Sequence, residues 1–288
     1  MLASFLITFR EALEAALIIG IIAAYLAKLG RKDLYRYLGA GIIGAIVASS
    51  GVAIAFKLIY GELGGMAESL FDGIAALTAA IVLTYMIFWM AHNSKKIKGE
   101  LQEKIDISIS KGHMLGIAAM SFIAVFREGV ETVLFLGTLA INSPIDTIIG
   151  FIAGLGVVII LSFIMFRGMY RLDLSKFFKY TSILLILFSA GLVATAVDEF
   201  NDAGIIPPVV AHVWDLNPPQ NPDGTYPLLH ENGLIGSSLK SLIGYHADPS
   251  LTLVLAYVGY WLIIGLFVHR TYKAPEKMKS QEVSADGS

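Results

Sequence analysis

Two short stretches of this 288-residue chain each place three ionisable side chains in the middle of an apolar segment. On a helix, positions i, i+1 and i+4 lie within an arc of about 100°, so each trio shares one helix face. The two carboxylates of a trio are i, i+3 neighbours that can hold one ion, and the arginine can keep the second carboxylate ionised. The trios are Arg10, Glu11 and Glu14, and Arg127, Glu128 and Glu131.

The chemistry of the trios points to a multivalent cation. Four glutamates and two arginines leave a formal charge of −2. An ionisable side chain at the centre of a bilayer costs at least about 2.5–3.5 kcal/mol, so six of them indicate a functional site. Because the chain has no cysteine and we expect no methionine near the trios, Cu(I) would be poorly served. Carboxylates suit hard cations, including iron, manganese, magnesium and calcium.

The composition identifies the class of protein that must position these residues. Hydrophobic residues make up 56% of the chain and charged residues 15%, whereas a soluble domain is about one quarter charged. This excludes a soluble enzyme, a disordered protein and a nucleic-acid binder, and predicts an all-α integral membrane protein in contact with lipid. Seven apolar segments are long enough to span a bilayer, near 2–27, 37–59, 70–91, 114–141, 145–166, 177–198 and 251–268.

These helices predict a membrane domain over residues 1–270, with a polar outer loop at 199–250 that contains a short helix near 234–245. Residues 271–288 are expected to form a disordered cytoplasmic tail. Seventeen of the 21 lysines and arginines lie in alternate connecting segments and the tail, which predicts an outer N-terminus and a cytoplasmic C-terminus. Eleven acidic residues fall on the opposite, outer side, where they would concentrate cations. Trp89 is interpreted as an anchor at the membrane interface.

The sequence also repeats itself. The segment from Phe9 to Glu14 matches that from Phe126 to Glu131, at an offset of 117 residues and three helices. With alternating helix directions, this predicts a 3+3 inverted-topology repeat, with its site at the membrane midplane, plus one additional helix. Glycines at 150 and 154 permit close helix packing, either within a protomer or between protomers, so the oligomeric state is left open.

The doubled Arg-Glu-x-x-Glu motif resembles the signature of the high-affinity iron permeases, also called oxidase-dependent iron transporters. Residues 71–73, 83–86, 89–90, 190–192 and 244–245 are similar to that family too, and the likeness covers about residues 1–270. It implies inward transport of iron, expected as Fe(III), as a substrate across the cell membrane, with no prosthetic group and no enzymatic activity. A separate iron-oxidising or iron-delivering protein outside the cytoplasm is an implied partner.

The resemblance assigns the motif glutamates as iron ligands, with both arginines as their supporting ion-pair partners. Where the family pattern has a glutamate, this chain has Asp72, a carboxylate one methylene shorter. Asp72, Asp198 and Glu199 at outer helix ends are the candidate path from the outer face to the site. Helix capping and ordinary solvation are the alternative for these three residues.

Other functions remain open on the residues alone. The trios can form a structural network of ion pairs that locks the first helix to the fourth, although two arginines cannot neutralise four glutamates. The cargo can be Pb(II), Mn(II) or another divalent metal. An intramembrane metal-dependent hydrolase is disfavoured because no histidine shares the motif faces, and a metal sensor is disfavoured because no output domain is evident.

Overall fold

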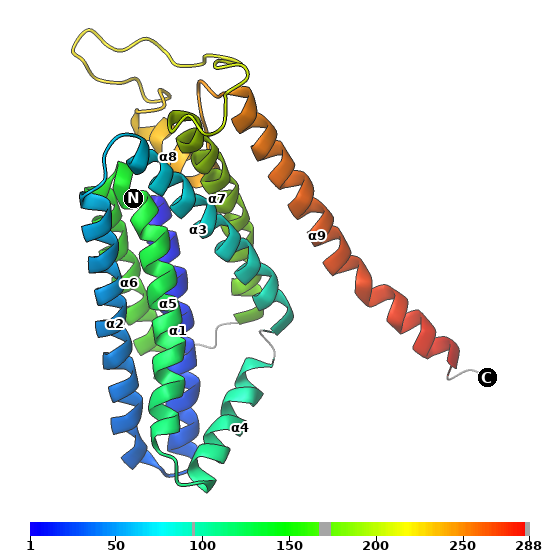
Figure 1. Cartoon of the computed structure of the whole chain (residues 1–288). Coiled ribbons are helices and arrows are strands. Elements are labelled where there is room, and N and C mark those ends of the chain that lie inside the picture. The colour runs from blue at the N-terminus through cyan, green and yellow to red at the C-terminus, as the bar shows by residue number, and fades with distance from the viewer. Residues whose placement is uncertain (94–95, 167–173, 286–288) are drawn as a thin grey trace.

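The computed structural model describes residues 1–93, 96–166 and 174–285, and within these ranges the chain is helical with no strand. Most of the helices pack as an antiparallel bundle, and α9 leans away from it (Figure 1). In chain order the elements are α1 (Leu2–Lys28), η1 (Lys32–Leu34), α2 (Tyr35–Gly61), α3 (Met66–Asn93), α4 (Ile97–Ser110), α5 (Leu115–Asn142), α6 (Pro144–Phe166), α7 (Leu174–Asp202), α8 (Leu234–Ile243) and α9 (Leu251–Ala285).

Five segments of the described chain are long and apolar enough to cross a membrane. They are Lys32–Gly61, Met66–Met90, Pro144–Met165, Thr181–Asp202 and Leu251–Val268. Helices α1 and α5, of 27 and 28 residues, are also long enough to cross a membrane, but each carries the three ionisable residues of one trio. The described chain is therefore all-helical, as in an integral membrane protein, and the two motifs lie in the interior of two of its long helices.

The long helices pair in a regular way. Helix α1 packs against α6, α2 packs against α5, and α3 packs against α7. Glycines allow the first two pairs to approach closely: a Cβ atom on Gly154 of α6 would lie 2.8 Å from the Phe5 carbonyl oxygen of α1, and one on Gly129 of α5 would lie 2.1 Å from the Ser49 hydroxyl oxygen of α2. The glycines at 150 and 154 thus serve packing within the protomer.

Two apolar clusters lie on either side of the motifs. One contains Ile7 of α1, Leu83 of α3 and Phe135 of α5, each at most 1% exposed. The other joins the far end of α1, at Ile22 and Leu26, to the start of α2, to α4 and to the start of α5. Helices α1 and α5 run side by side in opposite directions (Figure 1). The order of residues along them therefore places both motifs between these clusters.

The expected short helix in the outer loop is α8, which rests on α7 where Gly191 meets Gly244. Gly244 ends α8 with φ +70°, a conformation that glycine adopts without strain. Two features differ from expectation. Helix α4 forms in a connecting segment, and α9 continues to Ala285 through the expected disordered tail. The basic segment at 167–179 lies partly outside the described residues.

Candidate metal centre

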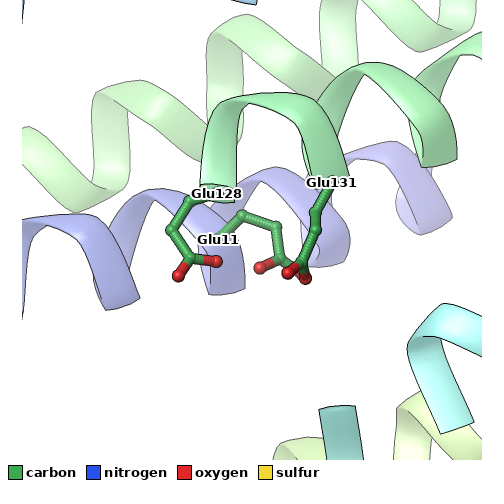
Figure 2. Close-up of side chains that lie close together, drawn as sticks. All are labelled: Glu11, Glu128 and Glu131. Atoms are coloured by element: carbon green, nitrogen blue, oxygen red, sulfur yellow. The ribbon is translucent and has the colours of Figure 1, made fainter. Parts of the chain in front are cut away.

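Three buried glutamates from two antiparallel helices face one another at the level of the motifs. Glu11 of α1 and Glu128 and Glu131 of α5 each offer one carboxylate oxygen, and these oxygens all lie within 4.8 Å of one another. Figure 2 shows the Glu11 carboxylate extending toward that of Glu131. Ligand oxygens about 2.0–2.6 Å from a hard cation can be separated by up to about 4–5 Å across it. The spacing therefore suits one ion.

The position of each glutamate follows from its place on the helix. Glu11 and Glu128 occupy the same position in the two motifs and are 0% and 2% exposed. The motif turn of α5 is held against α2 where Gly129 meets Ser49, and α1 is held against α6 where Gly154 meets Thr8. The second oxygens of Glu11, Glu128 and Glu131 have no hydrogen-bond partner in the protein. Buried carboxylate oxygens without a donor are costly unless a cation binds them.

The arginines pair within their own motifs, with nearly identical geometry. Arg10 lies 2.6 Å from Glu11 and 3.6 Å from Glu14. Arg127 lies 2.6 Å from Glu128 and 3.6 Å from Glu131. Each guanidinium therefore contacts the carboxylate that follows it as well as the one four residues on. The ion pairs across α1 and α5, which a purely structural lock would need, are not formed among these described side chains.

Helix α3 supports both arginines, which the sequence analysis did not predict. The Arg10 Nη2 atom donates to the Met86 sulfur at 3.3 Å, and the Arg127 guanidinium lies 5.2 Å from the centre of the Trp89 ring. The expectation that no methionine lies near the trios is therefore wrong, because helix packing brings Met86 to Arg10. Trp89, which was expected to act only as an anchor at the membrane interface, contacts the Arg127 side chain of a motif. Met86 and Trp89 are i, i+3 neighbours on one face of α3, and this spacing was the sequence signal that both side chains could face the same partner helices.

Glu14 is buried beside the other three glutamates and interacts with Glu128. It is 3% exposed, and neither carboxylate oxygen has a hydrogen-bond partner in the protein. It does not belong to the group of converging carboxylates that the described residues form. Instead, Glu14 and Arg127 line a cavity of about 940 Å³ that extends between α1, α3, α4, α5 and α6. The four glutamates predicted as equivalent ligands therefore have two different surroundings.

The candidate outer residues lie at one end of the bundle, where α3 meets α7. Gly73 packs closely against the Phe200 ring and joins the two helices there, since a Cβ atom on Gly73 would lie 2.6 Å from a ring carbon. Asp72 is 7% exposed with one unpartnered oxygen, and it interacts electrostatically with Glu199. Asp198 instead lies 3.5 Å from the His246 ring. Asp72 and Glu199 are thus brought together, and Asp198 is partly engaged elsewhere.

An all-helical bundle with helices of membrane length and buried, converging carboxylates is typical of an ion-transporting membrane protein. The chain belongs to the iron permease FTR1 family, whose model matches residues 1–274. This confirms the family to which the doubled motif was compared, and it makes the protein a multi-pass iron transporter by family.

Relatives match over nearly the whole chain. An uncharacterized protein of Archaeoglobus fulgidus is 36% identical over 277 residues, covering 94% of this chain and 96% of the relative. The ferrous iron permease EfeU of Yersinia pestis is 35% identical and covers 90% of each chain. The ferrous iron permease EfeU of Escherichia coli O6:H1 is 33% identical, covering 90% of this chain and 92% of the relative. No solved structure matches the chain.

Proposed function

We propose that this protein carries iron into the cell through the carboxylate cluster of Glu11, Glu128 and Glu131, with Glu14 close by. The observation that supports this most directly is the convergence of three buried carboxylates whose second oxygens have no donor. The two arginines hold the ligands in place and leave net negative charge for a cation. Metal binding to carboxylates displaces protons, so proton exchange during transport is part of the hypothesis.

The architecture that we propose is a seven-helix bundle in which α1 and α5 also span the membrane. Helices α1–α3 and α5–α7 form the inverted repeat, and α9 is the additional helix. The pairings support this, because exchanging the two halves turns the α1–α6 pair into the α5–α2 pair and leaves the α3–α7 pair unchanged. Stacked rings precede both motifs, at Phe5 with Phe9 and at Phe122 with Phe126. An inverted repeat places the substrate site at its midplane.

The direction of transport follows from the charges. Iron approaches the acidic outer face, where Asp72 and Glu199 lead toward the cluster, and leaves at the basic cytoplasmic side. An inside-negative potential favours this direction by about 2.3 kcal/mol per charge per 100 mV. We place the N-terminus outside and the C-terminus in the cytoplasm of a cell membrane. A separate protein that oxidises or delivers iron at the outer face remains part of the proposal.

The oxidation state is the open feature of the cargo. The motif resemblance implies Fe(III), whereas the relatives are called ferrous iron permeases, and oxygen ligands accept either ion. Pb(II) and Mn(II) are the alternative cargoes for the same site. Because the family is one of permeases, transport rather than hydrolysis is the activity to test.

The test is uptake of radioactive iron into proteoliposomes, supplied as a soluble Fe(III) chelate or as Fe(II) under ascorbate. We expect uptake by the wild type and its loss in the Glu11→Gln/Glu128→Gln double variant. Glu103→Gln, an exposed carboxylate of α4, is the matched control and should transport normally. The form of iron that is taken up faster reports the oxidation state of the transported ion. Competition of iron uptake by excess Mn(II) or Pb(II) tests the alternative cargoes. Full uptake by the double variant would show that the ion passes elsewhere.

A further inference from the structure

The two halves of the bundle on either side of the carboxylate cluster are filled differently. Toward the outer end, Ile7, Leu83 and Phe135 pack together, one turn beyond the motifs, and each is at most 1% exposed. Toward the opposite end lies the cavity of about 940 Å³. It begins at Glu14 and Arg127 and reaches Lys28 and Lys104. The site is therefore closed on one side and adjoins open space on the other.

The difference is sharpest at positions that the repeat makes equivalent. The 117-residue offset pairs Ile7 of α1 with Ala124 of α5, and Ile18 of α1 with Phe135 of α5. Ile7 and Phe135 are buried in the closed half, whereas Ala124 and Ile18 line the cavity. In each equivalent pair, therefore, one residue is buried in the closed half and the other lines the cavity. A transporter with two inverted halves has this asymmetry in each of its end states.

The glutamates lie in a sequence along the same axis. Helices α1 and α5 run in opposite directions (Figure 1). By sequence spacing, Glu131 is therefore one turn from Glu128 toward the closed end, and Glu14 is one turn from Glu11 toward the cavity. Glu14 lines the cavity, and the other three glutamates do not. Its two oxygens are without hydrogen-bond partners. An ion moving from the cluster toward the cavity meets Glu14 last.

We propose, building on the function proposed above, that this structure is the inward-facing state and that Glu14 is the release ligand. It draws the ion from the Glu11, Glu128 and Glu131 cluster into the cavity, while Ile7, Leu83 and Phe135 close the outer route. Glu14 is then needed for the ion to leave the cluster and is not needed for the cluster to hold it. Its equivalent, Glu131, is needed for binding.

Thiol labelling tests which half is closed, and it is independent of iron. The chain contains no cysteine, so single-cysteine variants need no background changes. Ala124→Cys and Ile7→Cys probe equivalent positions, with Ile18→Cys as a second cavity position. In metal-free vesicles of each orientation, a membrane-impermeant methanethiosulfonate should modify Ala124→Cys from the cytoplasmic side at least about tenfold faster than Ile7→Cys from the outer side. Equal rates, or modification of Ala124→Cys from the outer side only, would overturn the inward-facing assignment.

The role of Glu14 is tested by separating binding from flux, with Fe(II) under ascorbate as the probe. Glu14→Gln should bind iron in detergent with affinity within about twofold of the wild type, yet lose at least about tenfold of its uptake rate. Glu131→Gln should lose both properties, and the exposed control Glu103→Gln should lose neither. If Glu14→Gln weakens binding as much as Glu131→Gln does, Glu14 is an ordinary site ligand and the release role is wrong. If the wild type neither binds nor carries iron, the proposed function fails, and the release role with it, whatever the labelling shows.

Discussion

Gly41 of α2 and Ser121 of α5 touch so closely that a Cβ atom on Gly41 would lie 2.0 Å from the Ser121 hydroxyl oxygen. The Ser121 hydroxyl donates to the Leu38 carbonyl oxygen of α2 at 3.2 Å. The same relationship recurs in the other half of the bundle, where a Cβ atom on Gly150 of α6 would lie 2.5 Å from the Ser4 hydroxyl oxygen of α1. Ser4 and Ser121 are separated by the 117-residue offset of the motifs. One packing device therefore holds each motif helix to its partner.

This contact predicts that Gly41→Ala destabilises the bundle. The added methyl group must displace a serine oxygen and the Ala118 backbone, and overpacking of this kind costs about 1–3 kcal/mol. The measurement is thermal unfolding in detergent. Gly51→Ala on the same helix is the control, because nothing lies within 4 Å of its Cβ position, and it should unfold at or above the wild-type temperature. Unchanged melting of Gly41→Ala would show that α2 and α5 are not this close.

Much of the fold was predictable because apolar runs of membrane length are read directly from the sequence. The seven predicted segments overlie seven of the long helices, although five meet a criterion of length and composition alone. Helix α4 was not predicted, because its segment contains many charged residues and no apolar run of membrane length. Its apolar residues Ile97, Leu101 and Ile105 nevertheless recur every four positions, and Ile105 is fully buried against the far end of α1. That period was a readable signal of an amphipathic helix.

The site was predictable only as far as single helices determine it. Spacing places each trio on one face, and the duplicated motif indicates α1 and α5 as partners. Which carboxylates converge depends on helix rotation and on side-chain conformation. The sequence therefore could not show that Glu14 lies outside the group formed by Glu11, Glu128 and Glu131. The contact of Met86 with Arg10 likewise depends on how α3 crosses α1. Tertiary packing decides both.

We expect Met86→Leu to leave iron binding and uptake nearly unchanged. The Met86 sulfur contacts the Arg10 guanidinium, so Met86 supports the arginine and is not positioned as a metal ligand. A swap between methionine and leucine conserves volume and costs less than about 1.5 kcal/mol. The measurement is competition of Cu(I) and Mn(II) against iron uptake, which should be the same in both proteins. Met90→Leu in the cavity wall is the matched control. A selective loss of Cu(I) competition in Met86→Leu would show that the sulfur does bind metal.

Tyr25→Phe should loosen α4 from α1 without changing the metal site. The Tyr25 hydroxyl lies 2.9 and 2.7 Å from the two oxygens of Asp106 and is the polar tie between these helices at that point. Helix α4 carries lysines at which trypsin cleaves, and cleavage requires local opening. We expect faster cleavage within α4 in the variant and unchanged iron affinity. Tyr85→Phe, at an exposed position on α3, controls for the loss of a hydroxyl, and equal cleavage in all three proteins would contradict the tie.

The outer acidic residues predict a difference between uptake and binding. Asp72 is buried, has an unpartnered oxygen and interacts with Glu199, yet it is not among the described carboxylates that converge at the cluster. Asp72→Asn removes a charge from the proposed path and none from the cluster. We expect slower initial uptake at low external iron, with unchanged affinity in detergent, and recovery of the rate in Asp72→Glu.

The matched control for Asp72→Asn is Asp146→Asn, because Asp146 is an exposed acid at the same end of the bundle and pairs with the N-terminus. If general attraction of cations to the acidic face were sufficient, both variants would slow uptake equally, and added salt would remove the difference from the wild type through screening. A path through Asp72 requires that Asp72→Asn slows uptake more than Asp146→Asn does at high salt as well. Equal uptake rates of the two variants would show that Asp72 contributes only to the general negative charge of the acidic face.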